Sequence, residues 1–525
     1  MRCKPVVIGV LTTLSLAFAV ANAQAQSVQG SQPVIALVKA HDVAGLTSLL
    51  KKGADVNAPD TDGTTPLMLA VHERDSDMIK ALLAAGASVD ATNRYGATAL
   101  HTAARNGDAQ SATLLLNAGA NPAAALPEGE TVLMSAARTG NVDLIKALLA
   151  GGKSKAGETF NKADPNYKEG WKGQTALMWA AAEGHAAAID ALIAGGANPN
   201  EFSAEIVVPE PNPDRRAGGF VYPKIPKGRM SALHFAARNG HLDAALALVK
   251  GKADLNAVDA DGTNAMILAT LNGHPDVAYA LLEAGADPKI ADKYGRTILF
   301  NAVDMNTLDA NSRPAPVVTG NKTYVDVIKL AIAKGADVNA TLKSTLPIWV
   351  AQGGNHNPIL REGATAFLRA SMSADLPVMN ILLAAGADPK LATAGDDRPA
   401  GRRLGENTGK TTPLMAAAGV GWRDEISRGR VPDAIEAIKL LVAKGGNINE
   451  ANQGGDTPLT GAAMRSEPAL VEFLLSIGAD PKHKNARGLT ALDIANGNSD
   501  YSILPNPLVA DVIKKHAPTA KLSAR

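Results

Sequence analysis

Few side chains in this 525-residue chain are arranged for catalysis. Histidine, the usual residue for proton transfer near neutral pH and for metal binding, occurs ten times. However, the chain contains no His-Glu-x-x-His or Gly-x-Ser-x-Gly sequence, no phosphate-binding loop and no Rossmann glycine pattern. His356 lies in the polar segment Gly353–Pro358 and could ligate a metal, but no second ligand accompanies it at a useful spacing. We therefore expect no catalytic residue, no metal site and no cofactor, and the protein is predicted not to be an enzyme.

A repeated sequence unit must position whatever side chains the protein does use. Blocks ending in Gly-Ala-Asp or a close variant recur, and the first three are 33 residues apart, at Gly53–Asp55, Gly86–Ser88 and Gly119–Asn121. An apolar run such as Ala81–Ala84 precedes each block, and Thr-Pro-Leu or Thr-Ala-Leu follows about ten residues later. A unit of this length holds one small supersecondary element rather than a domain.

Each unit is predicted to fold as two helices and a turn. Pro66 favours a helix start after Thr65, because proline at the first helical position loses no N–H that the helix needs and already has a helical φ. Apolar residues at helical spacing from Met78 onward indicate a second helix, which should end at Gly86, where glycine easily adopts a left-handed conformation. The residue types of Asp90–Gly96 favour a turn that reverses the chain.

These units resemble the ankyrin repeat. The match is close, as one copy shows that combines Thr98–Ala104, Asn106-Gly107, Leu114–Leu116 and Gly119-Ala120. The tetratricopeptide repeat, whose period is one residue longer, lacks this Thr-Pro-Leu-His start and Gly-Ala-Asp end. The copies number eleven and begin near Asp62, Tyr95, Glu128, Lys172, Lys227, Asp261, Tyr294, Glu362, Thr408, Gly454 and Arg487. The resemblance implies an all-α fold: an α-solenoid of about eleven ankyrin repeats, each a helix-turn-helix with a finger loop, with an N-terminal half-repeat cap and several inserted loops.

The predicted organisation follows from these copies. Residues 1–25 form a signal peptide, residues 26–60 an N-terminal capping half-repeat, and residues 61–200 repeats 1–4. A proline-rich finger insert occupies residues 201–227. Residues 228–496 hold repeats 5–10 and the start of repeat 11 with their inserts, and residues 497–525 form a C-terminal cap. Because a solenoid buries its core only between neighbouring repeats, a chain of this length is expected to form one elongated array.

The first 25 residues have the pattern of a secretory leader. Arg2 and Lys4 precede the apolar run Val6–Val20, and small residues offer a cleavage site after Ala23 or Ala25. The leader resembles a bacterial one, so the protein is predicted to be periplasmic or secreted. No later stretch reaches the roughly 18 to 20 apolar residues that a membrane span requires.

Charge and cysteine usage exclude further classes. Loss of Arg2 and Lys4 with the leader changes the formal charge from +1 to about −1, so the chain as a whole offers no basic field for nucleic acid. Cys3, the only cysteine, is also lost, which excludes disulfides and thiol chemistry from the mature chain.

Departures from the 33-residue spacing mark inserted loops. Inserts near 201–227, 341–361 and 391–407 fall in the turns between repeats, those near 306–322, 421–432 and 497–507 fall between two helices of one repeat, and one at 152–162 follows an outer helix. Aromatic residues gather in or beside these inserts: Phe160, Tyr167, Trp171, Phe202, Phe220, Tyr222, Trp349 and Trp422. They either fold the loops back onto the array or anchor a partner, for which Trp and Tyr are favoured.

The resemblance also implies a concave surface made of the finger turns and of the residues just before the glycine between the two helices. Arg105 and Arg138 should stand one repeat apart there, about 8–10 Å by ordinary helix spacing. With Trp179 and Phe235 nearby, this surface would suit an extended peptide or an acidic loop; alternatively, the arginines are merely solvated and Trp179 is packed between repeats. The predicted partner-binding residues are Arg105, Asn106, Arg138, Tyr167, Trp171, Trp179, Glu183, Phe220, Tyr222, Arg238, Asn239 and Trp349.

The resemblance assigns structural roles to five of the histidines. His101 and His234 occupy the position where the family usually carries a structural histidine, and His185, His241 and His274 belong to the Gly-His pair between the helices.

Two functional hypotheses follow. In the preferred one, the protein is a non-catalytic scaffold of the bacterial cell envelope that binds another protein, secreted or envelope-anchored, through the concave face and the enlarged fingers; it has no membrane span and is a monomer. In the alternative, the inserts between Glu201 and Asn407 assemble a small-molecule or metal site, which would make the chain a hydrolase or a nutrient-binding protein.

Overall fold

The computed structural model describes residues 33–151, 162–206, 227–307, 320–346, 359–395, 408–421, 429–497 and 504–516. They form two compact units. The first unit holds the described residues up to 205 together with 228–236 and 243–254, and the second holds 206, 227, 237–242 and the described residues from 255 onward. The predicted leader and the candidate residues Phe220, Tyr222, Trp349 and His356 lie outside the described residues.

Helix pairs fill the first unit. Its first helices, which we call inner, are α3 (Pro66–His72), α5 (Ala99–Arg105), α7 (Val132–Thr139) and α9 (Ala176–Glu183). The outer helices are α4 (Ser76–Ala84), α6 (Ala109–Asn117), α8 (Val142–Ala150) and α10 (Ala186–Ala194), preceded by α2 (Val43–Lys51). The residues of α11 (Ala232–Asn239) and α12 (Leu242–Lys250) are divided between the two units.

The second unit continues the alternation. Its inner helices are α13 (Ala265–Leu271), α15 (Ile298–Thr307), α17 (Ala366–Met372), α19 (Pro413–Ala418), α21 (Pro458–Met464) and α23 (Ala491–Ala495). The outer helices are α14 (Pro275–Glu283), α16 (Tyr324–Ala333), α18 (Leu376–Ala384), α20 (Val431–Ala443), α22 (Pro468–Ser476) and α24 (Pro507–His516).

Threonine caps explain where the inner helices begin. The hydroxyl of Thr65 accepts a hydrogen bond from the amide of Met68 at 3.3 Å, and Pro66 occupies the first turn. Such a side chain satisfies one of the amide groups that a helix start leaves without a partner. The same cap is made by Thr98, Thr131, Thr175, Asn264, Thr365, Thr412, Thr457 and Thr490.

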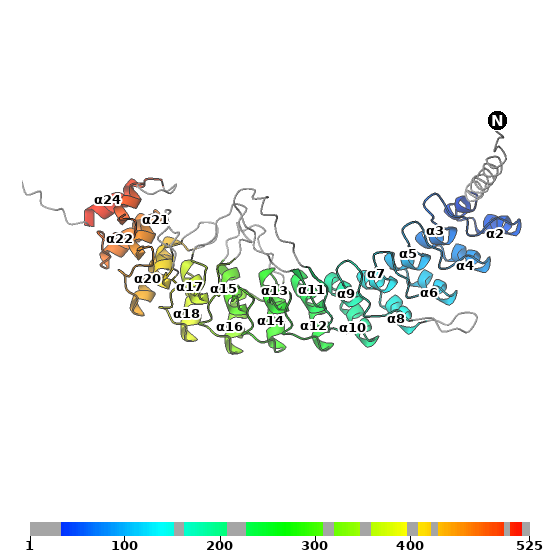
Figure 1. The fold of residues 1–525 in the computed structure, drawn as a ribbon, viewed down its shortest axis with the longest axis horizontal. Helices are drawn as coiled ribbons and strands as arrows, with labels where there is room; N and C mark the ends of the chain where they lie inside the picture. The colour runs from blue at the N-terminus through cyan, green and yellow to red at the C-terminus, as the bar shows by residue number, and fades with distance from the viewer. Residues whose placement is uncertain are drawn as a thin grey trace, which may run out of the picture. The chain divides into compact units, whose positions relative to one another are not determined.

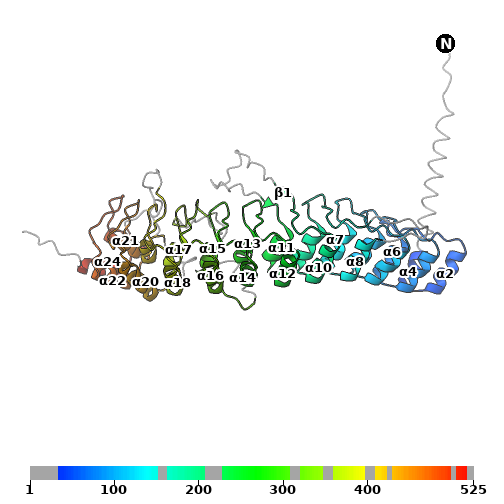
Figure 2. The ribbon, with the colours of Figure 1, turned by 90° about the horizontal axis from the view of Figure 1, so that it is seen from below.

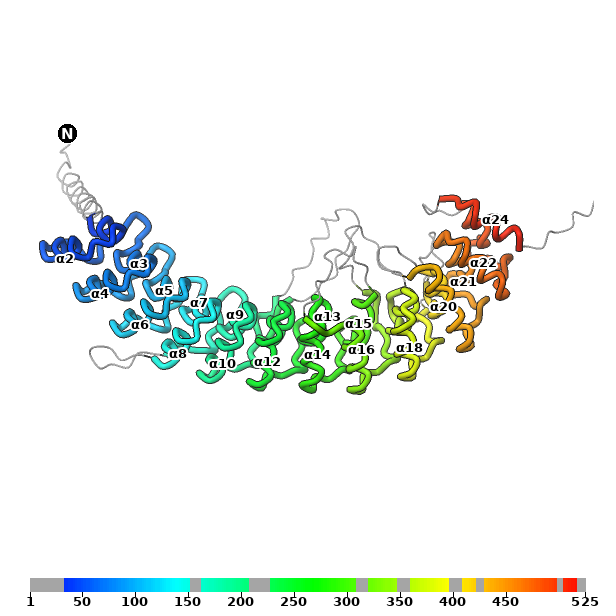
Figure 3. The backbone as a smooth tube through the Cα atoms, turned by 180° about the vertical axis from the view of Figure 1, so that it is seen from behind, coloured from blue at the N-terminus to red at the C-terminus, as the bar shows by residue number. Residues whose placement is uncertain are grey.

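Within each unit, helices of one kind pack against the next of their kind (Figure 1). In the first unit α3 contacts α5, α5 contacts α7 and α7 contacts α9, while α4, α6, α8 and α10 pack in the same sequence. Figure 3 shows the same order of helix pairs from behind. The apolar side chains between the pairs, among them Leu67, Leu100 and Leu133, are at most 1% exposed. Each repeat thus shields the apolar flank of its neighbour, as in a solenoid.

The predicted fold class is confirmed: the chain is an all-α solenoid, and the described residues contain eleven helix pairs from α3/α4 to α23/α24. In the described residues, strand is limited to β1 (Glu205–Ile206) and β2 (Lys227–Gly228), which pair with each other. Inserts expected within a repeat do fall between α15 and α16, α19 and α20, and α23 and α24. No helix in the described ranges is long and apolar enough to cross a bilayer.

Two details differ from the sequence-based expectation. Residues 33–39 are helical and α2 follows them, so the segment expected to hold half a repeat contains two helices. The insert expected to end at Pro432 ends two residues earlier, at Arg430, because α20 starts at Val431 and Pro432 lies in its first turn, where proline is well tolerated.

Candidate partner-binding surface

The turns between repeats, the fingers, lie together on one side of the helices in each unit (Figure 2). In the first unit, backbone hydrogen bonds join them: Arg94 N donates to Asp62 O at 3.1 Å, Gly170 N to Glu128 O at 2.9 Å and Ala204 N to Lys172 O at 2.7 Å. This close approach explains Gly129, whose φ is +91° and where a Cβ would lie 2.8 Å from the amide nitrogen of Gly170. These bonds fix three neighbouring pairs of fingers against each other.

A buried carboxylate shapes the finger that carries Trp171. Glu169, 7% exposed, accepts hydrogen bonds from the amides of Trp171 at 2.6 Å, Lys172 at 2.8 Å and Gln174 at 3.0 Å. Asn93 makes the corresponding turn two fingers earlier, accepting from the amides of Tyr95 and Ala97. Three amide donors to one carboxylate hold this turn rigidly.

The rigid turns display aromatic side chains to solvent. Trp171 is 78% exposed and Tyr95 58%, and Tyr167 beside the same finger is 42% exposed. A cation lies over two of these rings: Lys172 Nζ is 4.2 Å from the Trp171 ring centre and Arg94 is 4.8 Å from that of Tyr95. Tyr167 and Trp171 are therefore not buried in a satellite core of the kind that one interpretation of the insert aromatics required.

Four side chains form what we call the Arg105 cluster: Arg105, Glu130, Arg138 and Trp179. Nη2 of Arg105 is 3.4 Å and Nη2 of Arg138 3.9 Å from the Glu130 carboxylate. The Arg138 guanidinium also lies over the Trp179 ring, 5.3 Å from its centre. The two arginines expected to be one repeat apart are therefore brought together by one carboxylate, and Trp179 is half-buried beside them.

His101 lies beneath this cluster and has a structural role. It is fully buried, and its Nδ1 accepts from the Thr98 amide at 3.3 Å and lies 2.9 Å from the Thr98 hydroxyl. Burial, and secondarily the charge of Arg105, lowers the His101 pKa to about 4. The ring is therefore neutral at neutral pH. In the second unit, burial likewise lowers the pKa of His274, which precedes α14.

The other predicted residues differ in their surroundings. Asn106 is half-buried and links two repeats. Its side-chain Nδ2 donates to the backbone oxygen of His72 at 3.5 Å, and its backbone oxygen accepts from Arg74 Nη2 at 2.5 Å. Glu183 is exposed at the end of α9 in the first unit. Arg238 and Asn239 belong to the second unit, where Arg238 Nε donates to the Asn239 side chain at 3.2 Å.

The sequence analysis missed Glu130 and Glu169. Glu169 stands where other repeats carry an Asp or Asn that accepts from the same turn amides, such as Asp60, Asn93 and Asp259, so its position recurs in the sequence. Glu130 stands where the adjoining repeats carry Ala97 and Gln174, so no periodicity marks it. The only available signal for Glu130 was an acidic residue immediately before the threonine that caps α7.

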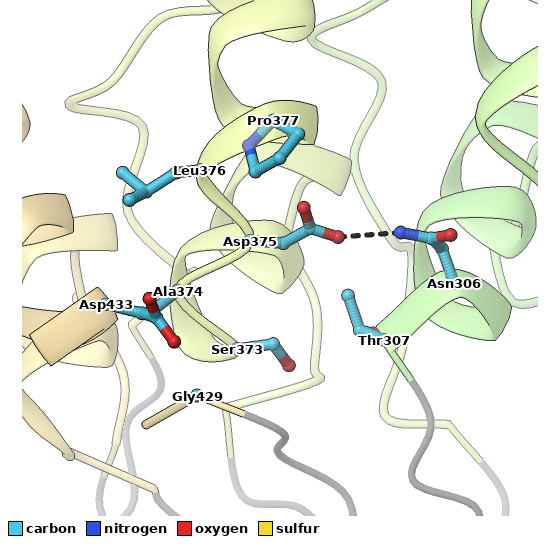
Figure 4. Close-up of a pocket in the computed structure, with 9 residues that line it drawn as sticks. All are labelled: Asn306, Thr307, Ser373, Ala374, Asp375, Leu376, Pro377, Gly429 and Asp433. Carbon is cyan, nitrogen blue, oxygen red and sulfur yellow. Dashed lines mark hydrogen bonds between the residues drawn. The ribbon is translucent and has the colours of Figure 1, made fainter. Parts of the chain in front are cut away.

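A separate pocket lies in the second unit (Figure 4). Its volume is about 330 Å³, and it is lined by Asn306, Thr307, Ser373, Ala374, Asp375, Leu376, Pro377, Gly429 and Asp433. Asn306 Nδ2 donates to Asp375 Oδ2 at 2.7 Å across it. The lining comes from the end of α15, from the turn before α18 and the first two residues of α18, and from Gly429 and Asp433 before and within the start of α20.

A buried ion pair supports the wall of this pocket. Arg369 is fully buried, and its Nε donates to Asp304 Oδ1 at 2.5 Å while its Nη1 donates to the Ser373 hydroxyl at 2.7 Å. The Asp375 side chain also caps α18 by accepting from the Val378 amide at 3.2 Å. These bonds hold Ser373 and Asp375 in place at the pocket and leave the Ser373 hydroxyl proton and further lone pairs of the Asp375 carboxylate for other contacts. In the described residues, no three His, Cys, Asp or Glu side chains are grouped in a way that could hold a metal ion.

The repeat sequence of the chain is similar to that of known proteins. The sequence profile of ankyrin repeats (three copies) matches residues 34–125, 123–203, 233–341 and 369–485, which is more than half of the chain. The chain is 36% identical over 66 residues to the ankyrin repeat and LEM domain-containing protein 1 homolog of Caenorhabditis elegans, covering 13% of this chain and 9% of that protein. It is 27% identical over 99 residues to the putative ankyrin repeat protein L271 of Acanthamoeba polyphaga mimivirus, covering 18% and 14% respectively. The matches span only a small part of either relative.

Proposed function

The chain belongs to the ankyrin repeat family, and from this premise we propose that it is a non-catalytic interaction scaffold of the bacterial cell envelope. Ankyrin repeats generally mediate protein–protein interaction. The partner is another protein, secreted or envelope-anchored, and not a nucleic acid. The scaffold itself acts as a monomer, exported by the leader in residues 1–25.

The observation that carries this proposal is the exposed, rigidly held Trp171. Tryptophan offers a large apolar area with few rotatable bonds, and its exposure in an isolated protein carries a cost that partner binding removes. Glu169 and the neighbouring fingers hold the turn before any partner arrives, so little conformational entropy is lost on binding. The Arg105 cluster belongs to the same unit and offers polar contacts.

Site-specific photocrosslinking tests the proposal. A photoreactive amino acid replaces Trp171 in the exported protein, and in a control it replaces Lys146, an exposed residue of the outer helix α8. We expect one dominant protein adduct from position 171 and none from position 146. Absence of an adduct from position 171, or the same mixture from both positions, would argue against a scaffold that uses this face.

The pocket of the second unit favours a second candidate function, binding of a small polar molecule. Asn306 and Thr307 immediately precede the insert at 308–319, and Gly429 immediately follows that at 422–428. Carboxylates of Asp375 and Asp433 with the hydroxyl of Ser373 suit a neutral polyol or an amine. A thermal-shift screen with polyols and amines should then find a ligand whose effect is lost in Asp433→Asn. A screen without such a ligand removes this candidate.

A further inference from the structure

We propose that the Arg105 cluster binds a carboxylate side chain, Asp or Glu, presented by an extended segment of the partner protein. This inference rests on the proposed scaffold function and specifies the chemistry of the partner at one site. It follows from the pairing, exposure and surroundings of the two arginines.

One carboxylate faces two guanidinium groups in this cluster. Glu130 is the acid that both Arg105 and Arg138 approach, so the cluster keeps an excess of positive charge. Oε1 of Glu130 also accepts the hydroxyl proton of Ser135 at 2.6 Å, which uses part of its capacity. His101 adds no positive charge at neutral pH, because its imidazole is buried and neutral.

The distances show that neither arginine is tightly paired. A charge-assisted N–H···O contact is ordinarily about 2.7–2.9 Å, whereas these are 3.4 and 3.9 Å. Arginines with structural roles in this chain are bound more closely: Arg296 lies 2.6 Å from Asp292 and Arg369 lies 2.5 Å from Asp304, and both are at most 9% exposed. The side chains of Arg105 and Arg138 are 43% and 42% exposed, so solvent and a partner can reach them.

The surroundings favour a carboxylate over other groups. The planar guanidinium presents donors that match the two oxygens of a carboxylate. Trp179 supplies a half-buried aromatic wall beside Arg138, and partly excluding water strengthens such a contact. Acidic residues stand nearby on the adjoining inner helices, Glu73 after α3 and Glu183 at the end of α9. A partner segment that carries one or two acids flanked by neutral or basic residues therefore complements the charges of the two arginines and of Glu73 and Glu183 on either side of them.

Selection from a random dodecapeptide display library tests this inference. The targets are the mature protein, the double variant Arg105→Gln/Arg138→Gln, and the charge-matched control Lys80→Gln/Lys146→Gln, which changes exposed residues of the outer helices α4 and α8. We expect peptides enriched in Asp or Glu from the wild type and the control, and loss of this enrichment with the arginine variant. Peptides with the acidic content of the unselected library, or the same enrichment with all three proteins, would overturn the proposal.

Binding of one selected peptide then locates the contact. Fluorescence anisotropy should show at least tenfold weaker binding to the arginine variant, less than twofold weakening in the lysine control, and weaker binding at higher salt. The ¹⁵N indole signal that is missing in Trp179→Phe should shift when the peptide is added to the wild type. Unchanged affinity in the arginine variant, or an unshifted Trp179 signal, would contradict the inference. The photocrosslink at position 171 could still identify a partner, so failure here is distinguishable from failure of the scaffold function.

Discussion

Single residues decide what the repeats display and what they hide. Glu169 and Glu130 are both acids in turns, yet the first is buried under three amide donors and the second faces two arginines. His101, near the start of the inner helix α5, is also buried. Together with Thr98 it completes the cap of its own helix. Its chemistry is therefore that of a neutral hydrogen-bonding group in the core.

The lowered pKa of His101 predicts a pH dependence of stability. Its pKa of about 4 in the folded protein lies below the unfolded value of about 6.5, so the unfolded chain binds the proton first as pH falls. The stability contributed by the neutral ring is present above about pH 6.5 and is lost toward pH 4, by up to about 3 kcal/mol. Thermal unfolding should therefore be more pH-dependent in the wild type than in His101→Gln between pH 7.5 and 4.5. Parallel losses in the two proteins would show that the ring does not titrate in this way.

At the scale of the element, side-chain amides link each repeat to the next. Asn449 Oδ1 accepts from the Asp480 amide at 2.8 Å, and its Nδ2 donates to Gly478 O at 3.0 Å. In other repeats an asparagine Oδ1 likewise accepts from the last backbone amide of the next Gly-Ala-Asp-like block. These asparagines are Asn57, Asn166, Asn200, Asn256 and Asn339. These bonds give the recurring Gly-Ala-Asp block a physical role, because its last amide is the donor.

Graded substitutions at Asn449 test this link. Asn449→Ala removes both bonds and should destabilise the end of the second unit by about 1–2 kcal/mol, whereas Asn449→Asp keeps the acceptor and should cost less. Asp90 occupies this position naturally in the first unit and accepts from Asn121. Hydrogen exchange should be faster at the Asp480 amide in the alanine variant and unchanged at Ser88. Equal exchange at Asp480 in all three proteins would mean that the bond contributes nothing.

The helices were predictable because most copies repeat the same cap, apolar face and terminating glycine; Lys252 replaces that glycine in one copy. Trp171 was chosen as a binding residue from its type and place. Its exposure was not predictable, because the acceptor position that Glu169 fills recurs in other repeats and does not determine where the Trp171 side chain points. It was not predictable that Arg105 and Arg138 share Glu130, because the distances in an ion pair depend on how side chains of two different repeats are placed. The pocket was beyond prediction for a similar reason: Asn306, Ser373 and Asp433 come from three repeats separated by inserts.

At the scale of the whole molecule, we predict that the leader is removed and the repeat array is exported. If residues 1–25 are an export signal, intact mass spectrometry of the protein from the cell envelope should give a chain that begins at Gln24 or Gln26. A control with Arg2→Glu and Lys4→Glu, which reverses the charge before the apolar run, should accumulate unprocessed. A full-length chain that begins at Met1 in the native source would contradict the predicted export.

The most direct test of the scaffold function is calorimetric titration of the mature protein with the partner identified by the crosslink at position 171. We expect one partner per chain, at least tenfold weaker binding to Trp171→Ala/Arg138→Gln, and unchanged binding to Lys146→Gln. Equal affinity for all three proteins would contradict recognition through the fingers and inner-helix ends of the first unit.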